Sequence, residues 1–229
     1  MLFVIAGCAD TPLTPQTPVA PLVVPPPIPT EVRLPLMEVE QGFRWDDEFR
    51  GLATMAIELG LLDLPGVVAR VPGHGAPPSV LLALPVSRRQ VDARLVARPL
   101  PAEPELRGTP LELELELCVS GQGCVSTTAV GTREAPWDAF GELLEGAAST
   151  LGVRVGPRVV DAWRTPGSSD PYAELLTGRA AATYYGILPP PRDPTDRRAN
   201  PVLRAVHLDP EQPLALWTLA RWDVAASSN

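Results

Sequence analysis

The clearest alternation of apolar and acidic residues runs from Leu111 to Leu117, where leucine occupies every second position and glutamate the positions between. A period of two places each set of side chains on one face of a β-strand, so this segment predicts a strand with a buried leucine face. The next residues, Ser-Gly-Gln-Gly at 120–123, suit a tight turn, and alternation resumes at 125–130. The pattern predicts a β-hairpin with its two cysteines, Cys118 and Cys124, opposite one another.

Further periodicities predict the rest of a sheet. Residues 31–40 and 67–71 predict strands, and apolar side chains every three or four residues from Asp46 to Leu61 predict a helix between them. A strand, helix and strand in succession favour a parallel pair. Residues 91–97 predict another strand before the hairpin, and three successive strands favour an antiparallel meander.

Helices are expected in most of the remaining chain. A short one is predicted at 80–84, and a longer one begins near Trp137, with an apolar face up to Leu151 and Gly152 as its C-terminal cap. Three more follow, at 171–185, 200–208 and 213–224. Their helix, loop, helix rhythm is typical of tetratricopeptide repeats, but about one and a half units are too few to be stable alone. We therefore expect these helices to dock on the sheet domain.

The chain begins Met-Leu-Phe-Val-Ile-Ala-Gly-Cys, an apolar run that is similar to the lipobox of a bacterial lipoprotein and makes Cys8 the predicted lipidation site. An export signal needs about 15 or more residues before this point, so we expect the true translation start to lie upstream. The alternative is a cytoplasmic protein whose apolar N-terminus ends by chance in a cysteine. Ala9 carries no inner-membrane retention signal of the enterobacterial kind, which favours the outer membrane.

Proline occurs at roughly every third position from Thr11 to Pro35. Because proline has no backbone N–H, this segment cannot form a helix or an inner strand. As polyproline II it would be a tether that holds the folded part up to roughly 75 Å from a membrane. A proline-rich ligand for a peptide-binding domain is the alternative, but no basic residue flanks a Pro-x-x-Pro core.

The chain has three cysteines. In an exported protein, the hairpin pair Cys118 and Cys124 would meet an oxidising compartment in which a disulfide persists. The alternative, a redox pair, is less favoured because five intervening residues do not match the Cys-x-x-Cys motif of oxidoreductases.

The overall prediction is an α+β fold, with a mixed sheet (a βαβ unit plus an antiparallel meander) and packed helices, followed by a short all-α extension similar to tetratricopeptide repeats. We expect four divisions: residues 1–8, a truncated lipoprotein signal; 9–30, the tether; 31–160, the α+β domain; and 161–229, the helical extension.

The net charge is −8, which argues against a nucleic-acid partner because phosphate binding requires a basic face. The two histidines, His74 and His207, lie in different predicted domains with no other ligand at metal-binding spacing, so no metal site is expected. No cofactor and no small-molecule substrate is predicted.

Three carboxylates share the solvent face of the hairpin strand: Glu112, Glu114 and Glu116. They could form a cation site or an acid/base pair. The favoured interpretation is a solvated face, in which Arg94 and Arg98 on the neighbouring strand pair with the glutamates.

Four aromatic residues of the helical extension are weak candidates for a peptide-binding groove: Tyr184, Tyr185, Trp217 and Trp222. Burial between helices is the simpler interpretation.

The order of elements also resembles a known family. A strand, a helix (Phe49–Leu61) and a strand lead into the meander, then to Thr150-Leu-Gly-Val, Asp170-Pro-Tyr with Leu175-Leu-Thr-Gly-Arg, and Arg204-Ala-Val-His-Leu-Asp-Pro. This resembles the amino-terminal domain of TolB and the related FlgO-type envelope lipoproteins, running on into tetratricopeptide-like helices. The resemblance implies a non-catalytic module of the cell envelope that binds other proteins.

The sequence thus predicts a lipid-anchored protein on the periplasmic face of the bacterial envelope, which binds envelope proteins and is not an enzyme. Two alternatives stay open. One is an envelope hydrolase that uses the glutamate face, and the other is a truncated sensor or regulator whose repeat array continues in relatives.

Overall fold

The computed structural model of the chain describes residues 29–40, 47–73, 88–101, 108–164, 170–191 and 200–227, with residues 222–227 described by their backbone alone. The predicted lipidation site, the tether up to residue 28, His74 and the helix expected at 80–84 lie outside these ranges. Among the described helices, none is both long enough and apolar enough to cross a membrane.

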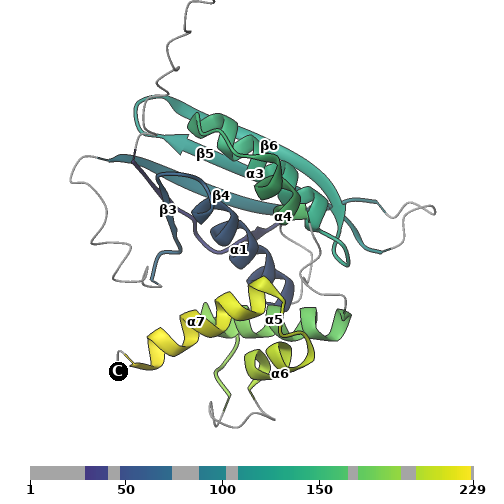
Figure 1. The fold of residues 1–229 in the computed structure, drawn as a ribbon. Coiled ribbons are helices and arrows are strands. Elements are labelled where there is room, and N and C mark those ends of the chain that lie inside the picture. Colours follow the sequence, from purple (N-terminus) through teal and green to yellow (C-terminus); the bar gives the residue numbers. More distant parts are fainter. Residues whose placement is uncertain are drawn as a thin grey trace, which may run out of the picture.

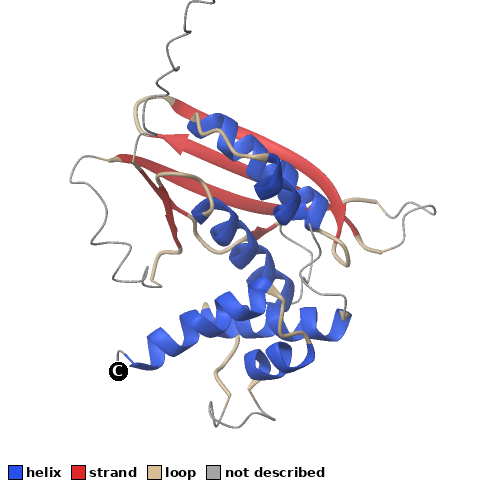
Figure 2. Cartoon of the chain, in the orientation of Figure 1, coloured by secondary structure: helices blue, strands red, loops and turns tan. Residues whose placement is uncertain are grey.

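The described strands form one mixed sheet, and this confirms the predicted α+β class (Figure 2). Its strands follow the order β3, β1, β4, β5, β6, with β2 beside β4. β1 pairs in parallel with β3, and the helix α1 lies in the connection between them. β4, β5 and β6 form the predicted antiparallel meander. The strands are β1 (Thr30–Arg33), β2 (Glu38–Val39), β3 (Val67–Arg70), β4 (Arg89–Pro99), β5 (Pro110–Val119) and β6 (Gly123–Thr132).

Six helices are described, and α1 and α3 lie on one face of the sheet (Figure 1). The predicted cap at Gly152 is present, with a left-handed conformation and φ of 70°. Asp170 and Asn200 each accept a hydrogen bond at a helix N-terminus. The helices are α1 (Asp47–Leu62), α3 (Trp137–Leu151), α4 (Pro157–Arg164), α5 (Pro171–Tyr184), α6 (Pro201–Leu208) and α7 (Pro213–Ser227).

The core lies between the sheet and these helices. Leu111, Leu113, Leu115 and Leu117 are each at most 1% exposed, so the alternating leucines form the inner face of β5 as predicted. The turn after β5 contains Gly121, and β6 begins at Gly123; their φ angles of 80° and 95° are conformations that glycine adopts without steric cost.

The single strand expected at 31–40 is wrong, because residues 34–37 separate β1 from β2. Pro35 cannot donate to a sheet ladder, and this accounts for the interruption. The side chains of α1 satisfy the backbone there: the amide of Met37 donates to Thr54 Oγ1 at 3.1 Å, and Arg50 Nε donates to the carbonyl of Met37 at 3.1 Å.

The division expected near residue 160 falls within α4, a helix that the sequence analysis did not predict. Trp163 is its one buried residue, and its indole Nε1 donates to Asp63 at the end of α1 at 3.1 Å. α4 therefore packs with the α+β part, and no periodic pattern in the sequence predicts its buried tryptophan.

The helical extension docks on α1 as expected. A Cβ placed on Gly51 of α1 would lie 2.3 Å from the backbone nitrogen of Ala182 in α5, and one on Gly178 would lie 2.7 Å from the carbonyl oxygen of Glu48. The two helices therefore approach backbone to backbone at these glycines, and a larger residue at either position would force them to shift apart.

Candidate functional site

The β5–β6 hairpin brings together most of the chemistry predicted from the sequence. Its register pairs Cys118 with Cys124 and places their sulfur atoms 2.05 Å apart, the length of a disulfide bond. The same register puts the leucines of β5 on the inner face, so the bridge and the glutamates share the outer face. Cys124 is exposed and Cys118 half-buried.

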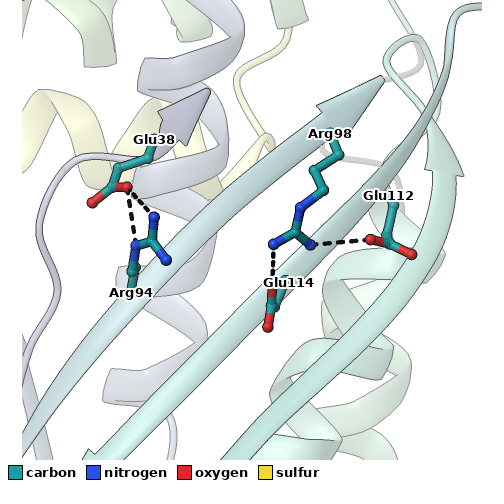
Figure 3. A network of polar contacts seen from close by, with 5 residues as sticks. All are labelled: Glu38, Arg94, Arg98, Glu112 and Glu114. Atoms are coloured by element: carbon teal, nitrogen blue, oxygen red, sulfur yellow. Dashed lines mark hydrogen bonds and ion pairs between the residues drawn. The ribbon is translucent and has the colours of Figure 1, made fainter. Parts of the chain in front are cut away.

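The outer face carries a network of ion pairs (Figure 3). Arg98 of β4 contacts two glutamates of β5 at once, with one Nη 3.1 Å from Glu112 and the other 2.5 Å from Glu114. Arg94 instead makes two hydrogen bonds to Glu38 of β2, at 3.0 and 2.7 Å. The predicted arginine pairing thus holds for Arg98, whereas the partner of Arg94 was missed, because β2 was expected to continue β1 without a break.

These ion pairs shift the pKa values of two glutamates on the outer face. The hydrogen bond from Arg98 lowers the pKa of Glu114, and the one from Arg94 lowers the pKa of Glu38. A general acid needs a raised pKa, so Glu114 is poorly suited to that role. The geometry is that of a solvated, partly paired surface.

One cluster on this face has the residue types of a metal site: ligand atoms of Glu116, Cys118 and Cys124 lie within 4.8 Å of one another. The disulfide consumes both sulfur atoms, and thiolates are the form that binds metal. In its oxidised state the hairpin therefore leaves one carboxylate there as a strong ligand. Of the two histidines, His74 lies outside the described residues and His207 is exposed on α6.

The aromatic candidates take part in packing. Tyr185 is 3% exposed and its hydroxyl donates to Glu58 at 2.8 Å, so the simpler interpretation, burial between helices, holds for it and its weaker candidacy for a peptide groove does not. Tyr184 and Trp217 are half-buried, and their rings lie 6.0 and 4.8 Å from the guanidinium of Arg221. The side chain of Trp222 lies outside the described residues.

The sequence analysis missed a buried charge pair between α1 and α7. Arg221 and Glu58 are 5% and 2% exposed and lie 2.8 Å apart. Burial raises the pKa of Glu58, although Arg221 opposes this. A glutamate within the apolar stretch Met55–Leu62 was the available signal, but its partner is 163 residues away and no spacing rule connects them.

A shallow pocket opens between α1, α5 and the segment that joins β6 to α3. Its wall includes Trp137 and three acids, Glu48, Glu134 and Glu174. Burial raises the pKa of Glu174, whereas hydrogen bonds from Thr109 lower the pKa of Glu134 against the effect of its own burial. The glutamates of the outer face take no part in it.

Comparison with known proteins gives little beyond this geometry. No family model matches the chain, and no curated protein matches it. Among solved structures it is similar to the dodecamer of a PelC point variant from Paraburkholderia phytofirmans, at 13% identity over 62% of this chain and 94% of that one, with a TM-score of 0.27. A TM-score this low does not establish a shared fold.

Proposed function

We propose that this protein is a lipid-anchored lipoprotein of the bacterial cell envelope, attached through Cys8 on the periplasmic face, with the outer membrane favoured. It is a non-catalytic binding and scaffolding module for other envelope proteins. The observation that carries this proposal is the Cys118–Cys124 disulfide geometry on the outer face of the hairpin.

An exposed bridge of this kind depends on the compartment. Thiol systems of the cytosol keep such cysteines reduced, whereas the periplasm keeps them oxidised. A folded part that uses this bridge therefore belongs outside the cytoplasm, which agrees with the lipobox-like sequence at Cys8 and the proline-rich segment after it. An anchor, a tether and a disulfide-bearing domain form one consistent arrangement.

The binding role is supported by the fold and by the outer face. A βαβ unit, an antiparallel meander and docked helices follow one another along the chain. This is the order of elements on which the proposed resemblance to TolB amino-terminal domains and FlgO-type lipoproteins rests. Two of the three glutamates that an envelope hydrolase would use, Glu112 and Glu114, are paired with Arg98, and the pKa of Glu114 is lowered. These features suit a charged recognition surface better than acid/base catalysis.

The test is intact-mass measurement and membrane fractionation of the native protein, without reductant. We expect loss of everything before Cys8, added acyl mass, and a further loss of two hydrogen atoms from the bridge. Cys8→Ala should abolish the acyl mass and the membrane location. As a matched control, serine at both hairpin cysteines should keep the acyl mass and the membrane location.

An unmodified protein in the soluble fraction, with three free thiols, would overturn the proposal. The sequence contains no lysine, so amine-reactive crosslinkers are a poor choice for finding partners. A photo-reactive amino acid placed on the exposed hairpin avoids that difficulty.

A further inference from the structure

β6 is the last strand of the sheet, and no other described strand lies beyond it (Figure 1). It pairs with β5 without interruption from Gly123 to Thr132, with no bulge in the register. Along the strand, Ala129 is buried, Thr127, Gly131 and Thr132 are half-buried, and the other residues are exposed. Within the described residues, one long side of the strand is therefore left without a partner strand.

The hairpin cysteines show which backbone groups face that open side. Their Cα atoms lie 4.0 Å apart, which identifies a pair without hydrogen bonds to each other, since a hydrogen-bonded pair is about 5.5 Å apart. Because the two kinds of pair alternate, the amides and carbonyls of Cys124, Ser126, Thr128 and Val130 point away from β5. These groups can form the hydrogen bonds of a β-ladder with another strand.

This edge lacks the features that usually block pairing. Residues 123–132 contain no proline and no charged residue, and Val125 and Val130 are 52% and 59% exposed. Natural edges are protected by such residues, by bulges or by shortness. The opposite edge of the sheet, β3, is four residues long and ends in Arg70.

Acidic side chains flank the edge on both faces of the sheet. On the outer face, the neighbouring strand carries Glu112, Glu114 and Glu116. Arg98 pairs with the first two, and Arg94, which is bonded to Glu38, lies opposite Glu116 in the register.

On the inner face, α3 lies directly over β6, since a Cβ on Gly146 would be 2.2 Å from Thr127 Oγ1. Leu143, on one side of Gly146, is buried, and Glu142, on its other side, is exposed. Glu142 therefore lies toward the open edge.

We propose that β6 is a docking strand, which pairs with an extended, basic segment of a partner protein by β-strand addition. Backbone hydrogen bonds would supply the affinity, and lysine or arginine on either face of the incoming strand would meet the acidic flanks. A second copy of this chain fits poorly, because it would bring the same glutamates to the seam in a protein of net charge −8. This inference rests on the proposed binding role and names its surface.

The experiment uses the purified, oxidised full chain carrying Cys8→Ala and fluorescent peptides of about eight residues, enough to span an edge strand. One peptide alternates valine and lysine, one alternates valine and glutamate, and a third is the basic peptide with methylated amides along one edge. Fluorescence anisotropy should show binding of the basic peptide at least about tenfold tighter than that of the other two. Equal binding of the methylated peptide would reduce the interaction to charge alone and overturn the proposal.

Two variants locate the site. Thr128→Pro removes an outward amide and should weaken binding of the basic peptide by about tenfold, and Glu142→Lys should weaken it while improving binding of the acidic peptide. Binding unchanged in both variants would overturn the proposal, as would a protein that is a dimer in solution and becomes a monomer with Thr128→Pro. The methylated peptide needs no variant, so misfolding of Thr128→Pro leaves the test intact. Because the assay uses purified protein, its failure is distinct from failure of the anchoring experiment.

Discussion

The buried pair of Glu58 and Arg221 makes a sharp prediction about how the helical extension is held. Arg221→Met keeps most of the apolar stem but leaves the carboxylate of Glu58 without its cation. Loss of one partner of a buried pair costs about 3–5 kcal/mol. The hydroxyl of Tyr185 still donates to Glu58 at 2.8 Å, which favours the lower end. The lost stacking of Arg221 on Trp217 adds about 1 kcal/mol, so we expect a loss of about 4 kcal/mol at neutral pH.

The loss should depend on pH in a definite direction. Burial already raises the pKa of Glu58, and removing Arg221 removes a charge that lowers it, so the pKa rises further in the variant. When the pKa of a group is higher in the folded state than in the unfolded state, protonation of that group stabilises the fold. This stabilisation is complete at pH values below the unfolded-state pKa and is lost as the pH rises through the folded-state pKa. The variant should therefore be closest to the wild type below pH 4.5, the ordinary pKa of a glutamate, and furthest from it above neutrality.

Urea unfolding followed by tryptophan fluorescence at both pH values measures the effect. The matched control is Arg164→Met, because Arg164 lies 2.7 Å from Glu145 but the two are 39% and 41% exposed. That change should cost less than about 1 kcal/mol at either pH. Adding Glu58→Gln to Arg221→Met should restore part of the stability, since no buried charge then lacks a partner. A loss below about 1 kcal/mol, or the same loss at both pH values, would refute this reasoning.

Three further changes test other parts of the structure. Serine at both hairpin cysteines should lower the free energy of unfolding by about 2 kcal/mol and make it insensitive to reductant; a stability that still falls with reductant would contradict the bridge. Gly51→Ala should lower the free energy of unfolding in urea by about 1–3 kcal/mol, because its Cβ would meet the α5 backbone. Gly156→Ala, with no atom within 4 Å of its Cβ, should change it little. Equal effects of the two substitutions would contradict the close approach. Arg98→Gln should raise the pKa of Glu114 in an NMR titration. A carboxylate whose pKa is lowered in the folded state stabilises the fold above the ordinary value of 4.5, and this stabilisation is lost as the pH falls through the folded-state pKa. The variant should therefore lose less stability than the wild type on acidification. An unchanged pKa of Glu114 would contradict the pairing.

The sequence predicted what repeats locally. The hairpin follows from alternating leucines and the glycines of its turn region, and the cap at Gly152 follows from a residue type that adopts the left-handed conformation without steric cost. In each case the signal and the structure lie within a few residues of one another.

What the sequence left open depends on contacts between distant segments. Trp163 of α4 donates a hydrogen bond to Asp63, which lies 100 residues away in the sequence. Arg94 pairs with Glu38 of β2, a short strand that is separate from β1 because the chain is interrupted at Pro35. The open edge of β6 was equally hidden, since strand order is a property of the assembled sheet. Local periodicity predicts a strand but does not say which side of it remains free.

The position of α1 has a consequence for how sequence variation in this protein should be interpreted. It is buried between the sheet and α5, and eleven of its sixteen residues are inaccessible, including Gly51 and Glu58. Substitutions there disturb two packing layers at once, so selection will remove them whatever the protein binds. Among relatives, invariance in α1 would record structural constraint, whereas a change of partner would leave its trace in the residues that border β6.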